Sequence, residues 1–251
     1  MTMPTIPRAP ARISVLTSGG GSNLQALIDH FAGLAACVGV ITFVASDNES
    51  AGALDRARAA GIATGVLDAP LDSDALLSLL ETAKTDVLVL AGYLKLVPEG
   101  VVRAFRGRLL NVHPALLPSF GGPGMYGKRI HAAVLEHGAT ITGVTVHFVD
   151  EHFDRGPIIA QWPVPVLPGD DATLLAARVL RTEHRLLPLC VAAVAAGAIV
   201  LGNDGCVHGH LDVPVSLHTP DWRFALIDDA PSPSPTGASA FATDVARLFP
   251  R

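Results

Sequence analysis

The regular alternation of β-rich runs with helical segments constrains the fold of this chain more than any other feature. A β-rich run at residues 12–17 is followed by a Gly-rich turn and then by a segment in which apolar residues recur at helical spacing. The same order recurs up to residue 113, with further β-rich runs at 38–46, 63–67, 86–92 and 108–113. This alternation predicts an α/β fold, with a doubly wound, mostly parallel sheet and flanking helices.

The pattern changes after His113. Residues 142–150 alternate like a strand, and a second strand is expected at 157–167, where two prolines place it at an edge. A long helix is predicted over 171–197, kinked or split at Pro188. We expect a flexible N-terminus at 1–11, one domain at 12–215, and a poorly ordered extension at 216–251 that is rich in Pro, Ser and Ala.

Composition excludes several classes of protein. With 49% hydrophobic and 16% charged residues, the chain can build a large core. A net charge of −5 supplies no overall basic surface for nucleic acid. The three cysteines are widely spaced, so we expect no disulfides. The N-terminus has no apolar core, and the apolar run at 187–201 is too short to span a membrane. We therefore expect a cytoplasmic protein without a membrane partner.

The Gly-rich turn at residues 18–23 is a candidate anion site. It joins the first predicted strand to the first predicted helix, where backbone N–H groups bind anions well. Its spacing matches neither a Walker A loop nor GxGxxG, so ATP and NAD have no specific support. A tight turn with Ser22 as the helix N-cap explains the same residues equally well.

Polar residues at the end of a predicted parallel strand form a second candidate site. Asn111 and His113 are two apart, so both side chains would face one pocket, as an oxyanion-stabilising pair or as a pair that satisfies a loop. Asp154 lies in an acidic loop and could hold His113 in its charged form, or be a turn residue. His147 is expected to face the same cleft. The spacing of the remaining histidines supports no metal site.

Six segments together carry a resemblance to a known family. In order they are SGGGSNLQALI, SDNESAGALDRARAAGI, DVLVLAGYLKLV, RLLNVHPALLPSF, TGVTVHFVDEHFDRGPIIAQ and RVLRTEHRLLP. From about Arg12 to Ala196 the chain closely resembles the folate-dependent phosphoribosylglycinamide formyltransferase family. NxHPxLLP and VHFVDxxxDxGPI are typical of formyl transfer in general, and SGxGSNLQ is typical of the purine branch. The resemblance implies a Rossmann-like formyltransferase fold.

The resemblance also implies roles for individual residues. A catalytic trio is implied at Asn111, His113 and Asp154. The ribose phosphate end of the substrate would be held by Gly20, Gly21, Ser22, Asn23 and Glu183. The folate pocket would include Leu94, Lys95, Leu96, Val97, Asn111, Asp150 and Asp154, with Lys95 where the family usually has Arg.

The implied reaction is direct attack of the glycinamide ribonucleotide amine on the formyl carbon of 10-formyltetrahydrofolate, a co-substrate. The tetrahedral oxyanion would be stabilised by Asn111 and charged His113, while Asp154 orients His113 and assists proton transfer. Neither a metal nor a covalent enzyme intermediate is implied. The partners are then small molecules, and the chain is expected to be a monomer or a homodimer.

The chain departs from the family at one position that matters for binding. Asp74 follows an Asp-Ser pair where the family often has a basic residue that helps to bind phosphate. Lys128 and Arg129 are hypothetical substitutes for that cation.

Four other activities share parts of the pattern. A formyltetrahydrofolate hydrolase normally adds an N-terminal domain, for which no room is expected before Arg12. A methionyl-tRNA formyltransferase needs an RNA-binding C-terminal domain, and the extension here is short and not basic. A formyltransferase for amino sugar nucleotides should lack the SGxGSNLQ loop. An inactive folate-binding protein would not need the intact trio.

Overall fold

The computed structural model describes residues 9–33, 38–68 and 71–211. These residues belong to one compact unit, Met1–Leu217. The expectations for the first eight residues of the N-terminus and for the extension at 216–251 lie outside the described residues. In the described part, no helix is both long and apolar enough to cross a membrane.

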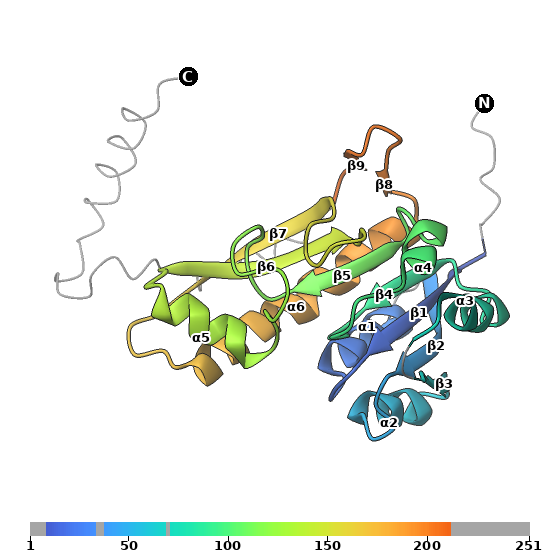
Figure 1. The fold of residues 1–251 in the computed structure, drawn as a ribbon, viewed down its shortest axis with the longest axis horizontal. Coiled ribbons are helices and arrows are strands. Elements are labelled where there is room, and N and C mark those ends of the chain that lie inside the picture. The colour runs from blue at the N-terminus through green and yellow to red at the C-terminus, as the bar shows by residue number, and fades with distance from the viewer. Residues whose placement is uncertain (1–8, 34–37, 69–70, 212–251) are drawn as a thin grey trace. The chain divides into compact units, whose positions relative to one another are not determined.

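The first half of the described chain is the predicted alternation of parallel strands and helices (Figure 1). The strands are β1 (Ala11–Thr17), β2 (Gly39–Ser46), β3 (Ala63–Val66), β4 (Val87–Leu90) and β5 (Leu109–His113). The helices between them are α1 (Ser22–Gly33), α2 (Gly52–Ala59), α3 (Ser73–Thr82) and α4 (Glu99–Ala104). Every pairing among these five strands is parallel.

The second half adds two antiparallel strands and the longest described helix. α5 (Lys128–Glu136) precedes β6 (Ile141–Phe148) and β7 (Ile158–Pro165), and α6 (Ala172–Ala195) leads to a hairpin of β8 (Ile199–Leu201) and β9 (Val207–Gly209). The sheet order is β3-β2-β1-β4-β5-β6-β7. The proline-containing strand β7 is therefore at the edge, as predicted, and the mostly parallel sheet is confirmed.

Apolar side chains on both faces of the sheet hold these layers together. Val87 and Val89 of β4 pack into the core beneath α1, α2 and α6, while Leu88 and Leu90 pack into the core with α3 and α4. Because side chains alternate along a strand, such a continuous apolar run is buried on both sides. The doubly wound arrangement follows from this pattern.

Helix α6 was predicted to kink or split at Pro188, and it is not split. Asp171 caps its N-terminus by accepting hydrogen bonds from the backbone N–H groups of Thr173 and Leu174, and the helix then continues through Pro188 to Ala195. A proline inside a helix costs about 3 kcal/mol. Burial of one side of α6, including Pro188 itself, offsets that cost.

Candidate functional site

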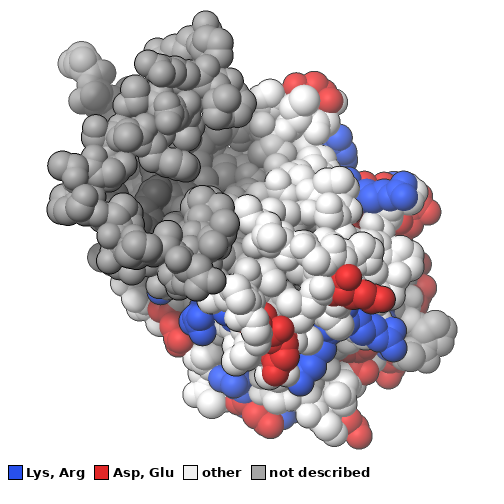
Figure 2. All heavy atoms as spheres, turned by 90° about the vertical axis from the view of Figure 1, so that its left-hand side faces the viewer, with Lys and Arg blue, Asp and Glu red and all other residues white. Residues whose placement is uncertain are grey.

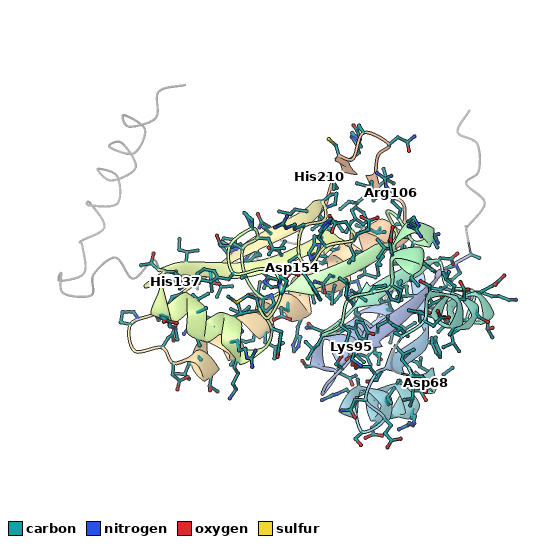
Figure 3. The ribbon with its side chains drawn as sticks, in the orientation of Figure 1. Asp68, Lys95, Arg106, His137, Asp154 and His210 are labelled. Carbon is teal, nitrogen blue, oxygen red and sulfur yellow. The ribbon has the colours of Figure 1, made fainter. Side chains whose placement is uncertain are left out.

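A cavity of about 570 Å³ opens where the strand order reverses between β1 and β4. Open α/β sheets bind ligands at this reversal, beyond the carboxyl ends of the strands. The cavity wall combines residues that follow β4 and β5, residues of α1, α5 and α6, and the loop between β6 and β7. Figure 3 labels two of the lining residues, Lys95 after β4 and Asp154 after β6. The cavity therefore spans the change from parallel to antiparallel pairing at β5.

Asn111 and His113 both line the cavity from the last residues of β5, as their spacing predicts. His113 is buried, its Nδ1 lies 3.4 Å from Asp154 Oδ1, and its Nε2 lies 2.9 Å from the Phe120 carbonyl oxygen. Both neighbours are hydrogen-bond acceptors, and a neutral imidazole has only one N–H to donate. An imidazolium can donate to both acceptors, and a neutral ring can donate to only one of them.

Asp154 is held against His113 by its backbone and by its neighbours. Its φ of 56° is left-handed, a conformation that Asp tolerates better than most residues. Its Oδ2 accepts from the Gly122 backbone N–H at 2.9 Å. Burial by itself would raise the Asp154 pKa, but the contacts with His113 and His147, the charge of His113 and the Gly122 N–H bring that pKa far below its usual range. Asp154 is therefore a carboxylate at neutral pH.

Glycine at position 121 allows the loop to pass close to Asp154. A Cβ atom built on Gly121 would lie 2.5 Å from Leu117 Cδ2 and 3.1 Å from Asp154 Cβ. Any side chain here would push the loop away from the carboxylate, and the Gly122 N–H and the Phe120 carbonyl would move with it. The contacts of Asp154 and His113 thus depend on this close approach.

His147 completes this group of polar residues in the cavity lining. It is buried on β6, and its Nε2 lies 3.2 Å from Asn111 Nδ2. The same nitrogen is 3.8 Å from Asp154 Oδ1, too far for a hydrogen bond. Asn111 Nδ2 is also 3.4 Å from Asp154 Oδ1. We call Asn111, His113, His147 and Asp154 the histidine cluster.

Asn23 and Glu183 face the same cavity from the first turn of α1 and the middle of α6. Asn23 Nδ2 donates to Glu183 Oε2 at 2.6 Å, and both side chains are buried. Burial raises the pKa of Glu183, and the hydrogen bond from Asn23 and the charge of His113 oppose that rise. The oxygen Oδ1 of Asn23 has no hydrogen-bond partner among the described residues. The Asn23–Glu183 pair therefore leaves hydrogen-bonding capacity unused.

The Gly-rich turn leads directly into α1. Gly21 has a φ of 73°, and a Cβ there would lie 2.6 Å from Ala53, so the position needs glycine. Ser22 is the first helical residue and so lies inside α1, one position after an N-cap. Gly20, Gly21 and Ser22 do not line the cavity, although their neighbour Asn23 does.

Arg56 is a cation at this turn that the sequence analysis missed. Its Nε donates to the Gly20 carbonyl oxygen at 2.8 Å, and its Nη1 lies 3.3 Å from Gln25 Oε1. Burial lowers the pKa of His184, and the positive charge of Arg56 lowers it further. The only signal for Arg56 was its place on the second helix, since the contact depends on how α2 packs against the turn.

The predicted cations Lys128 and Arg129 lie elsewhere. Lys128 lines the cavity, and its Nζ is 3.4 Å from Thr173 Oγ1 in the first turn of α6. Residues 173 and 183 are ten positions apart on α6, which is about 15 Å along a helix. Arg129 packs over the Tyr126 ring. Arg56 is therefore a cation that the described structure places beside the Gly-rich turn, and the binding roles of Lys128 and Arg129 stay predictions.

The segment predicted to bind folate forms one wall of the cavity. All four of its residues, Leu94 to Val97, line the cavity, and Leu94 and Leu96 are half-exposed. Lys95 Nζ lies 3.1 Å from Asp47 Oδ2, so its charge is partly neutralised within the protein. Asp150 does not line the cavity and instead accepts a hydrogen bond from the His152 backbone N–H at 2.9 Å. Within the described residues, no group of His, Cys, Asp and Glu is arranged to hold a metal ion.

Comparisons with known proteins agree with this arrangement. The profile of the family described as formyl transferase matches residues 11–191. A chloroplastic phosphoribosylglycinamide formyltransferase of Vigna unguiculata is 42% identical over 201 residues, which cover 77% of this chain and 64% of the plant protein. Phosphoribosylglycinamide formyltransferase of Escherichia coli K12 is 40% identical over 198 residues, which cover 74% of this chain and 88% of that enzyme.

A solved structure gives the same result. The crystal structure of phosphoribosylglycinamide formyltransferase from Anaplasma phagocytophilum superimposes with a TM-score of 0.74 and 37% sequence identity, covering 82% of this chain and 97% of that one. This chain spans less than two thirds of the Vigna relative but nearly all of the Anaplasma protein. The matched residues contain β1 to β7 and the histidine cluster. The chain therefore belongs to the formyl transferase family.

Proposed function

We propose that this chain transfers a formyl group from 10-formyltetrahydrofolate to the amine of glycinamide ribonucleotide, a step of purine biosynthesis. The observation that carries the proposal is that one cavity brings together the histidine cluster and the Asn23–Glu183 pair. The first group suits acyl transfer through an oxyanion, and the second suits a ligand with hydroxyl groups. The named relatives support the same substrate.

Three members of the histidine cluster, Asn111, His113 and Asp154, would supply the chemistry. The amine nitrogen of the acceptor attacks the formyl carbon, and the carbonyl oxygen becomes an oxyanion. The positive charge of His113 and an N–H of the Asn111 amide would stabilise it. Attack forms the new C–N bond, and collapse of the tetrahedral oxyanion then breaks the bond from the formyl carbon to N10 of the folate. The amine loses a proton and N10 gains one, with Asp154 assisting through water.

The two substrates would contact different parts of the cavity lining. The wall from Leu94 to Val97 has the apolar character that a folate ring system requires, with Asp150 in the neighbouring loop. The ribose hydroxyls of the acceptor would meet Glu183 and the unpartnered Asn23 Oδ1. The phosphate would bind at the N-terminus of α1, at Gly20, Gly21 and Ser22. Arg56 would supply the positive charge that Asp74 does not.

Other properties follow from the same proposal. The reaction needs neither metal nor covalent intermediate, and its partners are small molecules. On the face shown in Figure 2, described Lys and Arg side chains are interspersed with Asp and Glu, which does not favour a nucleic-acid partner. We propose a cytoplasmic enzyme, either monomeric or homodimeric, with a formyltransferase domain at residues 12–215.

A panel of acceptors tests the substrate. We expect formyl transfer to glycinamide ribonucleotide and a much higher KM for its dephosphorylated form. Turnover only with amino sugar nucleotides would replace the proposed acceptor. Formate release that does not need any amine would instead identify a formyltetrahydrofolate hydrolase.

A further inference from the structure

We infer that His147 is a positioning residue. Its unprotonated Nε2 atom accepts a hydrogen bond from the Asn111 amide and so fixes the orientation of that amide. The inference rests on the proposed role of Asn111 as an oxyanion donor. His147 has no role in the mechanism described above, yet it is almost fully buried beside that mechanism's residues.

The sheet brings the two side chains together. Asn111 of β5 and His147 of β6 are directly paired in the antiparallel register, so their side chains leave the same face of the sheet. The pairing of β6 with β7 shifts between Val146 and His147. Such irregularities occur next to active sites, where they redirect a side chain. The β5–β6 register and the irregularity in the β6–β7 pairing thus together direct the His147 side chain toward Asn111.

Hydrogen bonding determines which nitrogen of His147 carries the proton. His147 Nδ1 lies 2.7 Å from the Phe148 carbonyl oxygen, which can only accept, so Nδ1 carries the hydrogen. The other nitrogen, Nε2, faces the Asn111 NH₂ group, which can only donate. A proton on Nε2 as well would set two donors against each other at 3.2 Å. The contacts are satisfied only by the neutral Nδ1–H tautomer.

This arrangement uses both hydrogens of the Asn111 amide. One points to His147 Nε2 at 3.2 Å, and the other points to Asp154 Oδ1 at 3.4 Å. The longer contact is the weaker one and can be shared with an oxyanion that forms in the cavity. The His147 contact meanwhile prevents the amide from rotating, so no reorganisation is needed during the reaction.

Two substitutions at position 147 separate this role from simple packing. The side-chain amide of Gln reaches the place of Nε2, so His147→Gln can still accept from Asn111. The shorter amide of Asn reaches only the place of Nδ1, so His147→Asn keeps the Phe148 contact and loses Asn111. We expect His147→Asn to lower kcat about tenfold, less than outright removal of an oxyanion donor, with little change in KM. His147→Gln should lose clearly less, and equal losses in the two variants would contradict the inference.

A double-mutant cycle gives the decisive result. If His147 acts through Asn111, then His147→Asn should cost nothing further in an Asn111→Ala background. Losses that multiply would overturn the inference. Melting temperatures of all four proteins must show that each variant is folded.

One readout does not require turnover. Nitrogen-15 NMR of the His147 ring in the wild-type protein should show a protonated Nδ1 and a bare Nε2, and the reverse tautomer would refute the inference. If the wild type transfers no formyl group, the proposed function fails while this test of His147 still stands.

Discussion

Two groups of polar residues in the cavity, the histidine cluster and the Asn23–Glu183 pair, differ in how completely they are satisfied. In the histidine cluster, both ring nitrogens of His113, both hydrogens of Asn111 and both carboxylate oxygens of Asp154 face partners within the protein. In the Asn23–Glu183 pair, Asn23 Oδ1 has no partner among the described residues, and Glu183 is a buried acid with a raised pKa.

We expect the satisfied group to be preorganised for catalysis and the unsatisfied group to bind a ligand. An unpaired buried polar atom costs about 1–3 kcal/mol, a cost that a ligand can remove by supplying the missing hydrogen bond. Donors that are already fixed by their neighbours instead reduce the reorganisation needed in a transition state. Substitutions in the histidine cluster should therefore change kcat, and substitutions at the Asn23–Glu183 pair should change KM for the acceptor.

The largest effect is expected from His113→Ala. Removing one oxyanion donor costs about 100- to 1000-fold in kcat, because the charge on the oxyanion loses a fixed partner. Steady-state kinetics with saturating acceptor would measure the loss. The folate dissociation constant, measured by fluorescence titration, should change little. A variant that loses folate affinity but keeps kcat would show that His113 binds rather than catalyses.

A smaller effect on a different constant is expected from Glu183→Ala. A hydrogen bond to a charged group contributes about 1.5–3 kcal/mol, so KM for the acceptor should rise about tenfold or more. The substitution should leave kcat within a few-fold of the wild type, because Glu183 makes no hydrogen bond with His113 in the described structure and acts on it only through charge. If kcat fell as far as it does in His113→Ala, the Asn23–Glu183 pair could not be distinguished from the histidine cluster by its effect on the kinetics.

A weaker effect on the same constant is expected at Arg56, since its side chain is exposed. Exposed charges contribute up to about 1 kcal/mol, so Arg56→Met should raise KM for the phosphorylated acceptor only about two- to fivefold. Arg56→Lys is the matched control that keeps the charge. Equal KM values for the Met variant and the wild type would show that phosphate binding at the Gly-rich turn does not need the charge of Arg56.

Much of this arrangement is predictable from sequence, and the limits have physical reasons. Apolar runs such as 86–92 predict the doubly wound sheet because they must be buried on both faces. The spacing of Asn111 and His113 predicts a shared face. The contact between His147 and Asn111 depends on the β5–β6 register, and that between Arg56 and Gly20 depends on helix packing. Neither of these two contacts produces a periodic pattern in the sequence. The unbroken α6 likewise depends on burial around Pro188.

The smallest effect concerns stability. Because burial raises the Glu183 pKa above its ordinary value of 4.5, ionisation of Glu183 favours the unfolded chain. The neutral variant Glu183→Gln should therefore melt higher than the wild type at pH 8, by an amount on the order of 2–4 °C for each 1 kcal/mol. The gain should disappear as the pH falls below that ordinary value, where the wild-type side chain is protonated in both states. Calorimetry at pH 4 and pH 8 measures it, and a gain that did not depend on pH would exclude this cause.

The most direct test follows a labelled formyl carbon. Carbon-13 NMR of 10-formyltetrahydrofolate labelled at the formyl group would be recorded with the enzyme, with and without glycinamide ribonucleotide. We predict that the label appears as the formamide of the acceptor, only when the acceptor is present and not with His113→Ala at matched times. Label that appears as formate without the acceptor, or that remains on the folate in its presence, would contradict the assignment of formyl transfer to this cavity.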